Sequence, residues 1–246
     1  MRAGRRSGSG VLVALLGPDG CGKSTTTRLL LERFQREGIE AHSAYLGPWG
    51  QVRLATTRWV YEHGLVPEVI PWGRWLRQRT VRTLVPWRWR EERPAPEHSF
   101  PKILVKAIKA QIRGLVYYPL LFRELHYRYR KDVRPHLRRG AVVIAERYAF
   151  DLRYIHDTVE IETYPLLRRW VVDLFPRPDL TILLDNEPAR IHARKPQLSI
   201  EALTWQRESY RRVLEGRPHV VLRTDDGPEE VAATIVARVK ELRRGC

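Results

Sequence analysis

The stretch VLVALLGPDGCGKS, residues 11–24, decides the fold of this chain. It begins with a short apolar run, passes through a loop that contains three glycines, and ends at Lys23 and Ser24. The apolar run is typical of a strand covered on both faces, and the pattern after the loop predicts a helix from Lys23 to about Glu37. Residues 11–37 therefore predict a strand, a loop and a helix, the first unit of an alternating β and α fold.

The loop has the composition of a phosphate-binding site. Residues 17–24 fit the pattern G-x-x-x-x-G-K-S/T, placed between a predicted strand and a predicted helix. Glycines let successive backbone N–H groups point at a phosphate, and the helix N-terminus adds positive potential. Lys23 would bridge the β- and γ-phosphates of a nucleotide, and the Ser24 hydroxyl would bind Mg²⁺. The expected nucleotide-binding residues of the loop are Gly17, Gly20, Cys21 (as a small loop residue, not a nucleophile), Gly22, Lys23, Ser24 and Thr25.

Further apolar runs extend this unit into a sheet. They predict four more strands, each covered on both faces, over residues 39–46, 141–145, 180–184 and 219–222. Helical patterns lie between them, notably over residues 199–215 and 228–244. The sequence thus predicts an α/β fold of the P-loop NTPase type, a five-stranded parallel sheet flanked by helices.

Residues 47–140 interrupt the alternation and carry most of the positive charge. The 246 residues include 44 Lys and Arg against 28 Asp and Glu, a net charge of +16. Residues 50–139 alone hold 20 basic and 7 acidic side chains, a net of +13. This balance indicates an anionic partner, although 37 of the 44 basic residues are Arg, a skew that a GC-rich genome also produces. We expect a basic helical insertion that contributes to an acceptor site, with one or two helices over residues 101–133.

The remaining composition predicts a single domain in the cytoplasm. With 43% hydrophobic residues, the chain can build one sizeable core. Its two cysteines, Cys21 and Cys246, suit a reducing interior and cannot form a disulfide framework. No stretch approaches the ~20 apolar residues of a membrane span, and residues 1–10 read as a flexible leader.

A carboxylate and a guanidinium follow the strand predicted over residues 141–145. Glu146 and Arg147 would lie at the carboxyl edge of the sheet, where open α/β sheets bind their ligands. Glu146 would hold Mg²⁺ together with Ser24, and Arg147 would neutralise an acceptor phosphate or the transferring group. The alternative is a strand-end ion pair without function. Asp185, after the next strand along the chain, is a competing carboxylate of lower weight.

Residues 187–200 are expected to form a lid. Arg190, Arg194 and Lys195 lie within six residues on a short connection, and the two arginines would close over the triphosphate. A solvated basic loop is the alternative. No N-K-x-D sequence, which reads guanine, is present, and this argues against a GTPase.

Together these segments resemble the thymidylate kinase-like branch of the nucleoside monophosphate kinases. The likeness runs over GPDGCGKSTT (17–26), VVIAERY (142–148), PDLTILLD (178–185), ARIHARKP (189–196) and VVLRTDDGPEEVAATI (220–235). The resemblance implies ATP and Mg²⁺ as cofactors, acceptor contacts by Asp19 and Arg147, and stabilisation of the transferred phosphoryl group by Arg190 and Arg194. Relatives often dimerise through helices beside the second strand, so the resemblance also raises a homodimer.

Two departures from the family leave the acceptor open. Residues 45–50 read YLGPWG where authentic thymidylate kinases carry R-E-P-G, and Asp151, Ile155 and His156 replace residues that read thymine. The run ERYAFDLRY (146–154) looks more like divergent thymidylate kinase-like proteins found beside glycan-assembly genes. Asp151, one helical turn beyond Arg147, would then accept a proton from an acceptor hydroxyl, unless it pairs with Arg147 or Arg153.

Three functions are consistent with these observations. The first is ATP-dependent phosphoryl transfer to a nucleoside monophosphate such as dTMP. The second is transfer to a sugar or lipid-linked glycan at the membrane face, where Trp and Arg of residues 72–90 would contact lipid headgroups unless this stretch is a packed helix. The third is a nucleic-acid-binding ATPase, but no recognised module supports it, and no nucleic-acid partner is expected. A small phosphorylated or hydroxyl compound is the expected acceptor.

Overall fold

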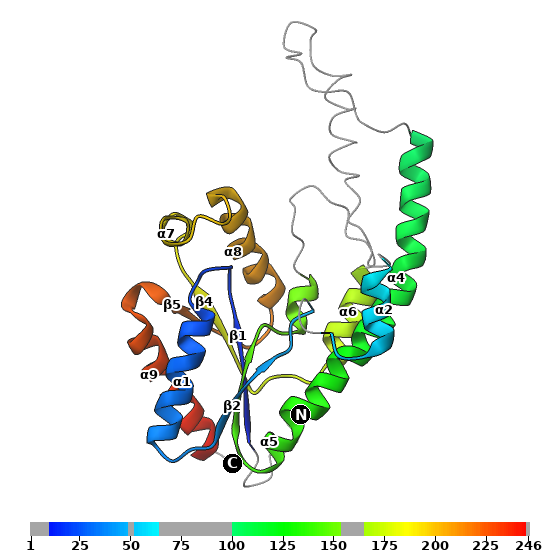
Figure 1. Cartoon of the computed structure of the whole chain (residues 1–246). Helices are drawn as coiled ribbons and strands as arrows, with labels where there is room; N and C mark the ends of the chain where they lie inside the picture. The colour runs from blue at the N-terminus through cyan, green and yellow to red at the C-terminus, as the bar shows by residue number, and fades with distance from the viewer. Residues whose placement is uncertain (1–9, 49–51, 64–99, 154–164, 245–246) are drawn as a thin grey trace, which may run out of the picture.

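A parallel sheet forms the centre of the protein (Figure 1). The computed structural model describes residues 10–48, 52–63, 100–153 and 165–244. Within these residues five strands stand in the order β2-β3-β1-β4-β5, and each neighbouring pair is parallel. They are β1 (Val11–Leu16), β2 (Ala41–Tyr45), β3 (Val142–Glu146), β4 (Leu180–Asp185) and β5 (Val220–Arg223). The predicted α/β fold with a five-stranded parallel sheet flanked by helices is confirmed.

The central strands are covered on both faces. Every residue of β1 is buried, and β3 and β4 are buried except for one terminal residue each. This agrees with their continuous apolar runs, since helical crossovers cover both faces of a parallel sheet. The same expectation was wrong for β2 and β5. These are the two edge strands, and neither contains a fully buried residue.

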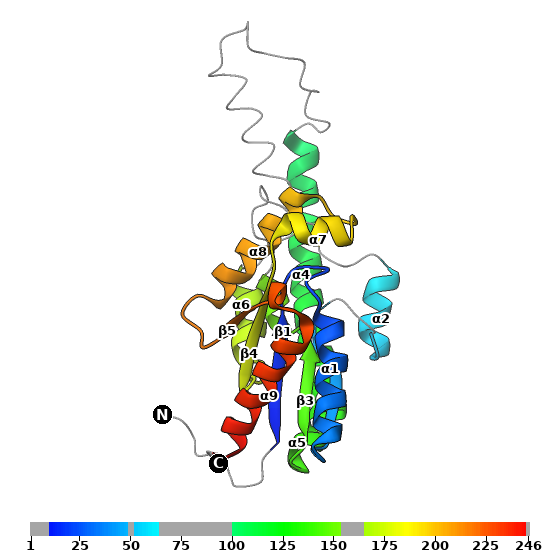
Figure 2. The same cartoon turned by 90° about the vertical axis from the view of Figure 1, so that its left-hand side faces the viewer.

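One face of the sheet packs against two helices that lie side by side, α1 (Lys23–Arg36) and α9 (Pro228–Arg244) (Figure 2). Leu30 and Phe34 of α1 and Ile235 of α9 are fully buried in this layer. Burial of each such side chain stabilises the fold by about 1.5–3 kcal/mol. Because α1 begins at Lys23, the same packing fixes the end of the glycine-rich loop.

The opposite face is covered by α4 (Phe100–Arg128), α6 (Pro165–Leu174) and the end of α8 (Ile200–Leu214). A short helix, α2 (Ala55–Glu62), packs on α4. Glu124 of α4 is fully buried and accepts hydrogen bonds from the backbone N–H groups of Arg53 and Leu54, each at 2.9 Å. These bonds anchor the backbone directly before α2, whose N-cap is Leu54.

The described parts of residues 47–140 are mainly helical. They comprise α2, α4, the π-helical segment η2 (Tyr129–Val133) and α5 (Arg134–Arg138), which leads into β3. In Figures 1 and 2, α4 extends well beyond the sheet. Residues 72–90, with their predicted membrane contact, and residues 1–9 of the predicted leader lie outside the described residues. Gly10, the last residue of that leader, is buried and donates its N–H to the Leu137 carbonyl oxygen at 2.8 Å. None of the helices described combines the length and apolar content that crossing a bilayer requires.

Short connections follow the carboxyl ends of the strands and bring the candidate site together. Apart from the loop after β1, they contain η3 (Ala149–Arg153), α7 (Pro188–Arg194) and η4 (Thr224–Asp226). The sheet register pairs Glu146 with Leu15 on one side and with Tyr45 on the other. Figure 1 shows α7 and α8 at this end of the sheet.

Candidate active site

The glycine-rich loop, residues 17–22, connects β1 to α1 through a backbone that only glycine adopts readily. Gly17, Gly20 and Gly22 have φ of 143°, 83° and 102°, and such positive values strain a residue with a Cβ. A Cβ on Gly17 would also clash with the carbonyl oxygen of Leu184. The loop therefore needs its glycines both for its conformation and for its close approach to β4.

Lys23, the first residue of α1, turns back into the loop. Its Nζ donates hydrogen bonds to the carbonyl oxygens of Gly17 (2.8 Å) and Pro18 (2.7 Å), and only 9% of the residue is exposed. The loop thus holds an ammonium group beside its own backbone, at the positive end of a helix. This combination attracts negative charge.

Ser24 and Glu146 form an oxygen pair next to this ammonium group. The Ser24 hydroxyl donates to Glu146 Oε2 at 2.9 Å, although the two residues are 122 positions apart in the chain. Ser24 is on the first turn of α1, and Glu146 is the last residue of β3. A carboxylate and a hydroxyl that lie together are suitable ligands for a hard divalent cation such as Mg²⁺. The two residues expected to share Mg²⁺ are in contact.

Arg147 is held in place by several partners. Its φ of 65° is the one positive value among the described residues other than glycine, and its backbone N–H donates to the Leu15 carbonyl oxygen at 3.2 Å. The guanidinium donates to the Asp19 carboxylate, to the Tyr210 hydroxyl (2.9 Å) and to Asp151 Oδ2 (3.4 Å). Burial opposes the charged form, but Tyr210, Asp151 and Asp19 outweigh it and raise the pKa of Arg147. Strained backbone of this kind is concentrated at functional sites.

Asp151 is a buried ion-pair partner of Arg147. It is fully buried, accepts a hydrogen bond from the Tyr210 hydroxyl at 3.0 Å, and has Arg147 as its ion-pair partner. Burial raises the pKa of its carboxyl group, although the Arg147 charge acts in the opposite direction. Of the two roles expected from the sequence, the structure shows the pairing with Arg147, and Asp151 does not line the cavity described below.

The predicted lid divides into two parts. Arg194, at the end of α7, donates to the carbonyl oxygen of Gly20 and therefore adjoins the loop. Arg190 pairs with Asp225 at 3.2 Å and, more distantly, with Glu187 at 3.9 Å. Of the two arginines expected to close over a triphosphate, only Arg194 is beside the loop in this structure.

These groups line one cavity of about 890 Å³, which we call the loop cavity. Ten of the predicted site residues line it: Asp19, Gly20, Cys21, Gly22, Lys23, Ser24, Thr25, Glu146, Arg147 and Arg194. The predicted residues Gly17, Arg190 and Asp151 do not. Three further lining residues belong to the predicted lid: Lys195, Gln197 and Leu198. The others were not predicted: Thr26, Tyr45, Thr224 and Pro228.

Two residues of α8 complete the support of the loop cavity and were missed by sequence reasoning. Gln206 accepts a hydrogen bond from the backbone N–H of Asp19 at 2.9 Å, and Tyr210 contacts both Arg147 and Asp151. They are four residues apart and so lie on one face of the helix. That spacing was available in the sequence, but it becomes informative only when α8 is known to pack against the loop.

Asp185, the competing carboxylate, is bound by two arginines of α8. Arg207 donates to both of its oxygens at 2.6 and 2.7 Å, and Arg211 donates to one of them at 2.9 Å. Although burial acts against ionisation, these two arginines lower the pKa of Asp185. Its oxygens are thus engaged in joining β4 to α8.

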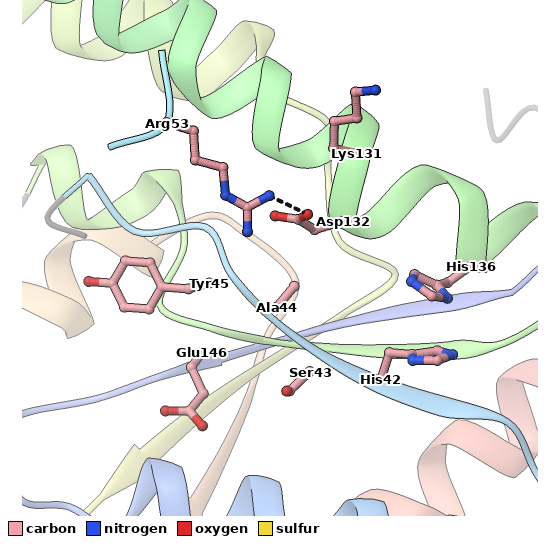
Figure 3. Close-up of a pocket in the computed structure, with 9 residues that line it drawn as sticks. All are labelled: His42, Ser43, Ala44, Tyr45, Arg53, Lys131, Asp132, His136 and Glu146. Atoms are coloured by element: carbon pink, nitrogen blue, oxygen red, sulfur yellow. Dashed lines mark hydrogen bonds and ion pairs between the residues drawn. The ribbon is translucent and has the colours of Figure 1, made fainter. Parts of the chain in front are cut away.

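A second cavity, of about 490 Å³, lies along the edge strand β2, and we call it the edge cavity (Figure 3). It shares Tyr45 and Glu146 with the loop cavity. Its other lining residues are His42, Ser43, Ala44, Arg53, Lys131, Asp132 and His136. Arg53 and Asp132 form an ion pair across it at 2.6 Å.

Comparison with known proteins assigns this chain to no family. A scan against models of protein families finds no match, and a search of curated proteins finds no matching sequence.

Proposed function

We propose that the protein is an ATP-dependent phosphotransferase that uses Mg²⁺. The observation that carries this proposal is the convergence of three features at the carboxyl edge of the sheet. These are the glycine-rich loop with Lys23, the oxygen pair of Ser24 and Glu146, and the anchored guanidinium of Arg147. Phosphoryl transfer needs little covalent chemistry from a protein. It needs a fixed arrangement of positive charge around phosphates, which these features would supply.

Each group has a definite role in this proposal. The loop N–H groups would hold the β-phosphate, and Lys23 would exchange the carbonyl oxygens of Gly17 and Pro18 for phosphate oxygens. Ser24 and Glu146 would hold Mg²⁺, which when bound neutralises charge on the phosphates. Arg194 already adjoins the loop through Gly20 and would contact the transferred group.

The acceptor would meet Arg147 and Asp19. Tyr210 and Asp151 would keep Arg147 oriented while its contact with Asp19 gives way to an anionic group of the acceptor. The resemblance to thymidylate kinases favours a nucleoside monophosphate such as dTMP. A sugar hydroxyl is the second candidate, because the described wall of the edge cavity, which adjoins Glu146, is mainly polar.

The test is ADP release by the purified protein with Mg·ATP in a coupled assay. The assay is run under three conditions: without an acceptor, with dTMP, and with each of a panel of hexoses and pentoses. Lys23→Ala is the active-site variant, and Lys240→Ala is the matched control, because Lys240 lies on α9 and pairs with Glu37. We expect acceptor-dependent ADP release that Lys23→Ala reduces by about 10²–10³-fold and Lys240→Ala leaves unchanged. Release that is independent of Lys23 would contradict the proposal.

A further inference from the structure

Three side chains with metal-binding atoms converge at the start of the edge strand. Glu40 and His42 are two residues apart beside and within β2, and His136 comes from α5. Glu40 Oε1 lies 2.8 Å from His42 Nε2 and 3.9 Å from His136 Nδ1. One donor atom of each residue lies within 4.8 Å of the other two. Figure 3 shows the rings of His42 and His136 next to each other, and their centroids are 3.6 Å apart.

The backbone around this cluster is fixed on both sides. In an extended chain residues i and i+2 point to the same face, which brings Glu40 and His42 together. The Glu40 carbonyl oxygen accepts a hydrogen bond from the Val142 N–H at 2.8 Å, and the His136 carbonyl oxygen accepts one from the Ala141 N–H at 3.1 Å. The fold, and not chance contact between mobile chains, therefore brings the three donors together.

A cationic group already occupies the space between two of the donors. Nη2 of Arg139 lies 2.8 Å from His136 Nδ1 and 3.6 Å from Glu40 Oε1. Because a guanidinium can only donate, His136 Nδ1 must present its lone pair to this position. The Arg139 side chain is 58% exposed, so it can turn into solvent and leave the donors to another cation.

We propose that Glu40, His42 and His136 bind a divalent transition-metal ion, with Zn²⁺ as the best match. Two imidazoles and one carboxylate are a ligand set that Zn²⁺, Co²⁺ and Ni²⁺ accept, whereas Mg²⁺ prefers oxygen ligands alone. Metal–ligand bonds of about 2.0–2.2 Å need donors about 3–3.5 Å apart. The rings of His42 and His136, whose centroids are 3.6 Å apart and whose planes are tilted by 34°, would turn so that both nitrogen lone pairs point at one ion. His42 would move its ring proton from Nε2 to Nδ1 to expose the Nε2 lone pair.

This site is separate from the proposed Mg²⁺ site. His42 precedes Tyr45, the register partner of Glu146, by three residues along β2, which corresponds to about 10 Å. A bound ion would join the edge strand to α5 and fix one end of the edge cavity. The inference does not depend on the proposed phosphotransferase activity.

The experiment titrates chelator-treated protein with Co²⁺ and measures the visible absorption of the bound ion. Equilibrium dialysis measures Zn²⁺ retention. All arms carry Cys246→Ser, which removes a thiol that could bind metal. In the presence of excess Mg²⁺, which would fill the proposed site at Ser24 and Glu146, we expect one transition-metal ion per chain. Binding should be at least about tenfold weaker in Glu40→Gln, His42→Gln and His136→Gln. The matched control is His219→Gln, an exposed histidine beside β5, which should leave the affinity unchanged.

Arg139→Gln gives a second, opposite test. If the guanidinium occupies the position of the ion, its removal should tighten Co²⁺ and Zn²⁺ binding. Melting temperatures without metal identify variants that remain folded. No saturable binding in the parent protein, equal affinity in folded His136→Gln, or no tightening in Arg139→Gln would overturn the proposal.

Discussion

The loop cavity and the edge cavity share Tyr45 and Glu146, but they hold positive charge in different ways. In the loop cavity, two loop carbonyl oxygens fix Lys23, and three side chains fix Arg147, which is only 16% exposed. In the edge cavity, Arg53 is 44% exposed and pairs with Asp132, and Lys131 is exposed.

This difference bears on how each cavity would bind a ligand. A group that folding has already ordered loses little further entropy on binding and presents its charge in one direction. Exposed long side chains lose that entropy only when a ligand arrives, and they adapt to its shape. The loop cavity is therefore suited to the reacting phosphates, and the edge cavity to a less exacting contact with the rest of an acceptor.

The largest expected effect is that of Glu146→Gln, because Glu146 belongs to both cavities. The variant keeps an oxygen for the Ser24 hydroxyl and removes the charge that would hold Mg²⁺. We expect kcat for ADP release to fall by about 10³-fold, since a bound metal contributes several kcal/mol to this chemistry. Asp185→Asn is the matched control, because it makes the same change at the end of β4, where the carboxylate binds Arg207 and Arg211. Similar losses in the two variants would contradict a special role for Glu146.

Sequence reasoning reached the loop cavity because its main parts are contiguous in the chain. Residues 17–24 carry the glycines, the lysine and the serine together, and Glu146 and Arg147 end an obvious strand. The contact between Ser24 and Glu146 followed from the rule that parallel strands end at one edge of a sheet.

The edge cavity could not be predicted in the same way. Its wall combines β2, Arg53, η2 and His136, and no spacing in the sequence relates these segments. The hydrogen bond of Asp151 with Tyr210 was equally hidden, because Tyr210 lies 59 residues further along the chain. β2 and β5 are less buried because they are the edge strands of the sheet. Apolar runs alone do not determine which strands lie at an edge.

A second prediction compares a fixed cation with an adaptable one. We expect Arg147→Ala to lower kcat/KM for the acceptor by about a hundredfold with little change in ATP affinity, because a preorganised charge is lost. Arg53→Ala should change the same quantity only a few-fold, as is usual for an exposed charge. Steady-state kinetics with each substrate varied in turn measure both effects. An effect of Arg53→Ala as large as that of Arg147→Ala would place the acceptor's anionic group in the edge cavity.

A smaller effect is expected from Tyr210→Phe, which leaves the ring and removes the hydroxyl shared by Arg147 and Asp151. The guanidinium should then be less well oriented. Loss of such a hydrogen bond costs about 0.5–1.5 kcal/mol. We therefore expect kcat/KM for the acceptor to fall by about 2- to 10-fold. The melting temperature distinguishes this from general destabilisation. Unchanged kinetics would show that Asp19 and Asp151 orient Arg147 without Tyr210.

The smallest effect concerns the carboxylate that serves structure and not phosphate binding. Because the pKa of Asp185 is lowered in the folded protein, its ion pairs stabilise the fold above about pH 3.8, the unfolded value, and this contribution is lost as the pH falls through the folded pKa. Asp185→Asn should therefore reduce the free energy of unfolding by about 1–2 kcal/mol near pH 6 and by little near pH 2.

Urea unfolding at several pH values measures this difference. The matched control is Glu208→Gln on the same helix, because Glu208 pairs with Arg212 at 3.3 Å while both side chains are more than half exposed. An exposed pair of this kind contributes about 0–1 kcal/mol, so the control should unfold almost like the parent protein at each pH. A pH-independent loss in Asp185→Asn would mean that Asp185 stabilises the fold through packing and not through its charge. Glu146 and Asp185 would then differ in how they pack as well as in the two arginines that surround Asp185.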